Sequence, residues 1–140
     1  MYQESSLMFE KIVLHVGFHR TGSTTVQREL DTNRWALLDD GVRIPSFNIS
    51  GRRLANHSVP IFNAFKADNS SYHANKVLGV DPREAHEPSL CQVESMLSQS
   101  SGTLVISGED ISSLNESELT EFLRVLCDHT ESIVIFGLFS

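Results

Sequence analysis

Basic residues are scarce in this chain relative to acidic ones. Its 140 residues include 11 Lys and Arg against 18 Asp and Glu, which gives a formal net charge of -7. Because binding along a nucleic-acid backbone requires a basic surplus to neutralise phosphates, this balance argues against a nucleic-acid partner. One small anionic ligand remains compatible with it, since a single loop can be positive on an acidic protein.

Long apolar runs are also absent. No stretch approaches the roughly 18 residues that a membrane-spanning helix needs, so the sequence predicts no membrane span. The first residues are not a basic segment followed by an apolar one, which predicts that there is no signal peptide and that the protein is cytoplasmic.

Clusters of metal ligands are missing as well. Cys91 and Cys127 have no metal-ligand spacing and lie in apolar helical patterns, so they are predicted to be reduced packing residues. His15 and His19 stand four apart, but outside any predicted helix, so this spacing does not put them on one face. The sequence therefore predicts no metal site.

The chain does contain apolar strand patterns that alternate with helical ones. Residues 46–88 are rich in Ser, Asn, Gly and Pro and predict loops around one short helix. Strands are predicted over 11–16, 103–107 and 132–139, with a short extended segment over 42–45. Helices are predicted over 23–30, 33–40, within 56–65, 89–98 and 115–129.

This order predicts an α/β fold in which helices flank a parallel sheet, as one domain over residues 1–140. Ligands of such sheets lie at the carboxyl ends of the strands. The strand over 11–16 ends in "GFHRTGST" and the strand over 103–107 ends in "SGED". The glycine-containing loop and Glu109 are therefore expected at the same edge of the sheet.

The loop over residues 17–24 is close to a nucleotide-binding phosphate loop. Gly17 and Gly22 have the spacing of that pattern and Thr24 fills its hydroxyl position, but Ser23 stands where the lysine belongs. Backbone N–H groups at the start of the following helix favour an anion. Arg20 supplies a cation within the loop, and a guanidinium can bridge two anionic oxygens. The alternative is a simple turn with a solvent-facing arginine.

The segment "VLHVGFHRTGSTTVQ" resembles the 5′-phosphosulfate loop of sulfotransferases, most closely that of bacterial sulfotransferase-like proteins. Arg20 stands where many members have lysine. The segments "DDGVRIPS", "ANHSVPIFNAF" and "LVISGEDIS" resemble later parts of the family with less specificity. The positions that match the loop signature directly are His15, Gly17, His19, Thr21, Gly22, Ser23, Thr24 and Gln27.

The resemblance implies a P-loop NTPase-like topology and the donor 3′-phosphoadenosine 5′-phosphosulfate (PAPS). It implies transfer of the sulfuryl group to a hydroxyl or amine, with a carbohydrate as the family-level acceptor and no metal at this step. Arg20 would be catalytic. The donor's 5′-phosphosulfate would be held by a short segment of the loop, namely His19, Arg20, Thr21, Gly22, Ser23 and Thr24.

An acceptor hydroxyl also needs a base, and Glu109 is the first candidate by position and by resemblance. The alternative is that Glu109 forms local contacts near the next helix. Asp110 is its immediate neighbour. His57 is a second candidate base; the alternative is that it makes ordinary structural hydrogen bonds.

The end of the chain departs from the family. Residues 137–140 stand where the family has an arginine and a serine for the donor's 3′-phosphate, so that site has no counterpart in the sequence. The expectation is a truncated N-terminal portion of the domain, with an incomplete sheet, self-association through apolar edges, and little or no transferase activity. A kinase-like nucleotide-binding domain and a non-catalytic anion-binding remnant remain the alternatives.

Overall fold

A four-stranded parallel sheet forms the centre of the molecule. The structure is a computed structural model that describes residues 8–16, 23–99 and 101–137, without the side chains of Ser23 and Thr24. The strands are β1 (Lys11–His15), β2 (Val42–Arg43), β5 (Thr103–Ser107) and β6 (Ile133–Phe136), in the order β2-β5-β1-β6. This is the predicted α/β class, and the order is compatible with a Rossmann-like or P-loop-like fold.

The register of the sheet follows from the apolar runs of its two inner strands. Ile12 and Leu14 of β1 pair with Leu104 and Ile106 of β5, and all four are buried. Inner strands of a parallel sheet are covered on both faces, which accounts for their near-continuous apolar sequence. The same register brings His15 opposite Ser107, so the two inner strands end side by side.

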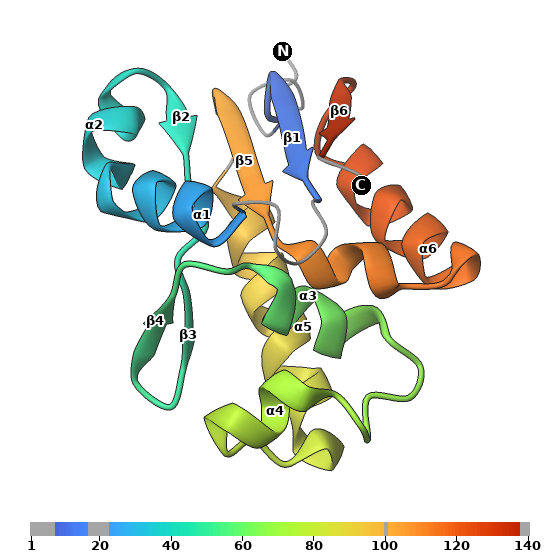
Figure 1. The fold of residues 1–140 in the computed structure, drawn as a ribbon. Coiled ribbons are helices and arrows are strands. Elements are labelled where there is room, and N and C mark those ends of the chain that lie inside the picture. Colours follow the sequence, from blue (N-terminus) through green and yellow to red (C-terminus); the bar gives the residue numbers. More distant parts are fainter. Residues whose placement is uncertain (1–7, 17–22, 100, 138–140) are drawn as a thin grey trace.

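Helices flank the sheet, and the one hairpin lies beyond the carboxyl ends of its strands (Figure 1). The helices α1 and α2 lie beside β5 and β2, and α6 lies beside β6, while α3 lies beyond the carboxyl ends of β1 and β5. The helices are α1 (Ser23–Thr32), α2 (Arg34–Asp39), α3 (Ser58–Phe65), α4 (His73–Leu78), α5 (Pro82–Ser98), the 3-10 helix η2 (Glu109–Ser113) and α6 (Glu116–Cys127). The hairpin joins β3 (Phe47–Ile49) to β4 (Arg52–Leu54).

The helix α6 forms as its sequence predicts. The side chain of Asn115 accepts a hydrogen bond from the backbone N–H of Glu118, and the Glu118 side chain accepts one from the backbone N–H of Asn115. This capping box satisfies donors at the helix start. Phe122 and Leu126 are fully buried against the core. The helical spacing of the apolar residues and the capping residue Asn115 are therefore enough to predict this helix from the sequence.

The prediction of loops over residues 46–88 is wrong in large part. Phe47 is fully buried and anchors a hairpin whose turn has Ser50 and Gly51 at positive φ, so the Ser- and Gly-rich segment is a tight turn between strands. The helix α5 begins at Pro82, where Asp81 caps it, and continues through Pro88 to Ser98. The predicted helix over 89–98 therefore covers only the second half of α5, because the residues before it were assigned to a loop on their composition.

The role assigned to the cysteines is also wrong. Cys91 on α5 and Cys127 at the end of α6 are both free thiols, as predicted, but both are exposed. On α5 the buried residue is Val93, two positions after Cys91. On α6 it is Leu126, the residue before Cys127. An apolar helix pattern does not by itself say on which side of the buried stripe a small residue lies.

The edge strand β6 carries exposed apolar side chains. Val134, Ile135 and Phe136 are 41%, 51% and 51% exposed. An apolar edge strand can pair with a second chain, so self-association stays a prediction that solution measurements have to test.

Candidate functional site

The carboxyl ends of β1 and β5 are joined by polar contacts. The ring Nδ1 of His15 lies 2.7 Å from the hydroxyl oxygen of Ser107, and both residues are buried. The backbone N–H of Gly108 donates to the carbonyl of His15 at 3.0 Å. These contacts fix the two strand ends against each other at the point where the chain leaves β1 for residues 17–22.

The predicted donor-binding loop falls mostly outside the described residues. His19, Arg20, Thr21 and Gly22 lie there, as do the side chains of Ser23 and Thr24. The described parts fix only the two ends of this loop. It connects His15 and Val16, at the end of an inner strand, to the first turn of α1 at Ser23.

Glu109 lies at this same edge and contacts α1. It is the first residue of η2, directly after β5, and its Oε2 accepts a hydrogen bond of 2.7 Å from the side-chain amide of Gln27. Gln27 and Glu109 are 3% and 6% exposed. A buried hydrogen bond to a carboxylate is strong and geometrically specific, so it ties the helix that follows the loop to the end of β5.

The charge of Glu109 also acts on His15. Burial lowers the pKa of His15 below its ordinary value, and the neighbouring carboxylate of Glu109 opposes this shift. The net effect keeps the imidazole neutral over a wider pH range. His15 with Ser107 and Gln27 with Glu109 are thus two buried hydrogen-bonded pairs at the same edge of the sheet.

His57 is built into this edge as a structural residue. It is 1% exposed and directly precedes α3. Its ring Nδ1 accepts a hydrogen bond from the backbone N–H of Ser107 at 2.9 Å, and the backbone N–H of His57 donates to the carbonyl of Ser107 at 2.8 Å. These contacts support the structural interpretation of this histidine over its role as a base, because the unprotonated nitrogen is already occupied.

The pKa of His57 follows from the same environment. Burial, and secondly the positive charge of Arg53, lower it to about 3. Among the described residues the Nε2 atom of His57 has no hydrogen-bond partner. The imidazole therefore stays neutral in the folded protein at ordinary pH.

Close packing at Gly108 sets the position of α3. A Cβ atom at this residue would lie 2.5 Å from the Oγ and 2.6 Å from the backbone N of Ser58. The hydroxyl of Ser58 in turn accepts a hydrogen bond from the backbone N–H of Asp110. Only glycine lets α3 approach the strand end so closely.

The side chain of Asp110 has a different hydrogen-bond partner from that of its neighbour Glu109. Its carboxylate accepts a hydrogen bond of 2.6 Å from the hydroxyl of Tyr72, and burial, more than this bond, raises the pKa of that phenol. Both residues line a cavity of about 540 Å³ between α3, α4 and η2. Other polar residues around this cavity include Asn56, Lys66 and His73.

Sequence reasoning did not assign roles to Gln27 or Ser107. Gln27 matches the last position of the loop signature, which marks it as a residue of interest. Its hydrogen-bond partner, Glu109, could not be predicted from the sequence. Ser107 follows an apolar run and comes two residues before Glu109, so the sequence places it at the end of the strand. Its contact with His15 is not predictable from the sequence.

The structure offers no metal centre within its described ranges. No group of three or more His, Cys, Asp or Glu side chains there is arranged to hold a metal ion. Over the same residues, no helix has the length and apolar character to cross a membrane.

Comparisons of the chain with models of protein families, with curated proteins and with solved structures found no match.

Proposed function

We propose that this edge binds PAPS and that the protein transfers its sulfuryl group to a hydroxyl acceptor. In this proposal residues 17–24 hold the 5′-phosphosulfate, with Arg20 as the cation and Glu109 as the base. The observation that carries it is the junction at the edge of the sheet. The inner strand β1 leads through residues 17–22 into α1, and β5 beside it brings Glu109 into contact with Gln27.

The fold supports an anion at this junction. A helix start presents unpaired N–H groups and the positive end of its dipole. In α1 these groups belong to Ser23 and the residues after it, directly after the loop that contains Arg20. The buried bond between Gln27 and Glu109 fixes α1 relative to β5, so the N–H groups are oriented before a ligand arrives. Such preorganisation is a main source of electrostatic catalysis.

The transfer step follows from this arrangement. The acceptor oxygen forms a bond to sulfur, and the bond from sulfur to the bridging oxygen of the 5′-phosphate breaks. The hydroxyl proton passes to Glu109, and adenosine 3′,5′-bisphosphate leaves with the electrons of the broken bond. Arg20 and the N–H groups of the loop stabilise the charge that grows on the leaving phosphate, as in phosphoryl transfer.

We assign the acceptor to the cavity beside Asp110 and its class to carbohydrates. Asp110, the residue after Glu109, lines this cavity, and in the proposal an acceptor held there presents its hydroxyl to the base. Its wall combines the rings of Phe62 and Tyr72, stacked at 3.9 Å, with the carboxylate of Asp110 and the amide of Asn56. Apolar ring faces with a few fixed polar groups suit a sugar, which has both kinds of surface.

Calorimetric titration tests the donor site. The protein is titrated with adenosine 3′,5′-bisphosphate, with ATP and with sulfate, and so are Arg20→Gln and the control Arg52→Gln. Arg52 is an exposed arginine on β4. The bisphosphate is expected to bind most tightly, and Arg20→Gln is expected to weaken it by about tenfold or more, because a charge-assisted contact is lost. The control should bind as the parent does.

Two results would contradict the donor assignment. Tighter binding of ATP would favour the kinase-like alternative, and no binding of any of the three would overturn the proposal. The role of Glu109 needs a separate readout, since Glu109→Gln keeps an oxygen that can accept from Gln27. This variant is expected to retain bisphosphate binding and to transfer labelled sulfate more slowly than the parent, whatever the parent's rate. Unchanged transfer would remove Glu109 as the base.

A further inference from the structure

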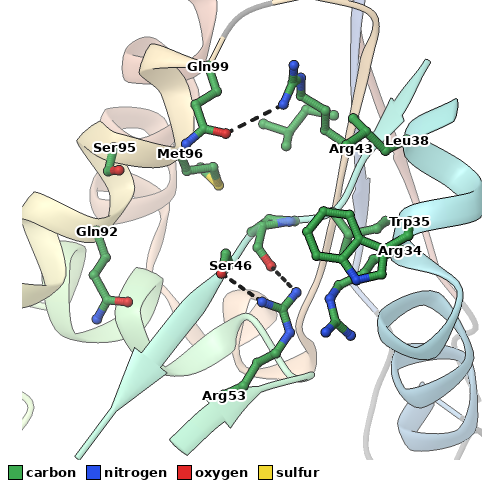
Figure 2. A pocket seen from close by; sticks show the side chains of 13 residues that line it. Arg34, Trp35, Leu38, Arg43, Ser46, Arg53, Gln92, Ser95, Met96 and Gln99 are labelled. Atoms are coloured by element: carbon green, nitrogen blue, oxygen red, sulfur yellow. Dashed lines mark hydrogen bonds between the residues drawn. The ribbon is translucent and has the colours of Figure 1, made fainter. Parts of the chain in front are cut away.

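A second cavity lies away from the proposed donor site. It has a volume of about 190 Å³ and lies between α2, the segment that follows β2, and α5. In Figure 2, Trp35 and Leu38 form the α2 side, while Ser95, Met96 and Gln99 form the α5 side. One water needs only about 10–15 Å³, so the space suits a small organic molecule. The residues at the β1–β5 edge do not line it.

Positive charge gathers around this cavity on an otherwise acidic protein. Three arginines line it, and the described residues of its wall include no carboxylate. Asp31, behind the wall, pairs with Arg53 at 2.9 Å and lies 3.6 Å from Arg34. Among the described residues Arg43 has one hydrogen bond, a long one of 3.5 Å to the neutral amide of Gln99. Asp31 thus offsets part of the charge of Arg34 and Arg53, while Arg43 pairs with no carboxylate of the described residues, which leaves the cavity locally positive.

One of the arginines around the cavity also has a donor that the described residues leave unsatisfied. The Nε–H of Arg34 is buried and has no hydrogen-bond partner among the described residues. A buried donor without an acceptor is unfavourable, so Arg34 adds unsatisfied hydrogen-bonding capacity to the wall of the cavity. Figure 2 shows Arg43 at one end of the cavity and Arg53 near the other. An anionic group at either end would find a guanidinium.

The remaining wall is apolar and includes an exposed aromatic ring. Trp35 is 67% exposed, although it is the largest apolar side chain and the single tryptophan of the chain. The guanidinium of Arg34 lies 5.3 Å from the centre of its indole ring, which holds the ring in place through a cation–π contact. Met96 and Leu104 contribute further apolar surface. A flat, fixed ring beside apolar side chains suits the face of another ring.

We propose that this cavity binds a small organic anion that carries a ring, with the ring against Trp35 and the anionic group on Arg43, because Arg53 is already paired with Asp31. Apolar pockets with a few placed charges are the usual form of small-molecule sites. The site is separate from the proposed PAPS site, so either proposal can fail without the other.

The indole itself reports on binding, because the chain has a single tryptophan. The probes are phenyl phosphate, and its two halves, phenol and inorganic phosphate. Phenyl phosphate is expected to give a saturable change in tryptophan fluorescence, with an affinity at least about tenfold above that of either half, since both parts of the site then contribute. No saturable change, or equal affinity for one of the halves, would overturn the proposal.

A pair of arginine variants locates the contact. Arg43→Gln removes a guanidinium of the wall and, within the part of the chain that the structure describes, one long hydrogen bond. It is expected to weaken phenyl phosphate binding by about tenfold. The matched control is Arg52→Gln, an exposed arginine that does not line the cavity. Arg20→Gln should also leave binding unchanged. Equal binding by Arg43→Gln and the parent, or loss of binding in Arg20→Gln, would refute the assignment.

Discussion

Mild acid is expected to destabilise this protein through His57. In the folded chain the pKa of this residue is about 3, against an ordinary 6.5, mainly because the imidazole is buried. Protonation would require Nδ1 to give up the hydrogen bond that it accepts from the N–H of Ser107. The proton therefore binds the unfolded chain first.

The sign and size of the effect follow from this difference. Below pH 6.5 the unfolded state binds a proton that the folded state does not, so the free energy of unfolding falls as the pH falls, until about pH 3. The slope is about 1.4 kcal/mol per pH unit, which gives about 2 kcal/mol lost between neutral pH and about pH 5. The pKa of His15, which burial also lowers, adds an effect of the same sign.

Urea denaturation at neutral pH and at about pH 5 measures this loss in the parent and in His57→Asn. The asparagine places an oxygen near the position of Nδ1 and does not titrate. The variant should be less stable at neutral pH, because it leaves space in a packed region. Its loss on acidification should be smaller than that of the parent by about 2 kcal/mol. Equal losses in the two proteins would refute the reasoning.

Three substitutions test the contacts that build the edge of the sheet and one helix start, each by urea denaturation. Gly108→Ala should cost about 1–3 kcal/mol, because its Cβ meets the backbone of Ser58; a change of a few tenths would contradict that contact. Gln27→Leu should cost about 1.5–3 kcal/mol, since it leaves the buried carboxylate of Glu109 without this donor, and unchanged stability would speak against the bond. Asn115→Ala should cost about 1 kcal/mol through the lost cap of α6, whereas no loss would show that water replaces the cap.

The strands and the best-patterned helices could be predicted from the sequence because their signals are local. The apolar run of β1 marks a strand covered on both faces, and Asn115 marks the start of α6. The adjacency of β1 and β5, which brings His15 to Ser107, follows from the topology of parallel sheets only once the number and order of strands are known.

The hairpin over β3 and β4 and the first half of α5 were missed for different reasons. Phe47 is buried by residues far along the chain, so the strand signal around it is tertiary. Pro88 is tolerated within α5 because its ring is exposed, while buried residues before and after it, such as Ala85 and Val93, hold the helix in place. Propensity alone therefore gives too short a helix.

The candidate site was predictable in its location and not in its contacts. Glu109 could be placed at the strand end by the order of elements, but its bond to Gln27 joins residues 82 positions apart. The cavity beside Trp35 left no local pattern either, because Arg43 and Arg53 come from different strands and Met96 from a helix. Such convergence is visible only in three dimensions.

Site-resolved nuclear magnetic resonance with PAPS tests the central claim most directly. With backbone and side-chain amides assigned, the account predicts the largest shift changes in residues 17–24, in the side-chain amide of Gln27 and in the backbone of Ser107 to Glu109. It also predicts that Arg20→Gln reduces all of them together. Changes confined to the surroundings of Trp35, or no saturable change at all, would contradict a phosphosulfate site at the edge where β1 and β5 end.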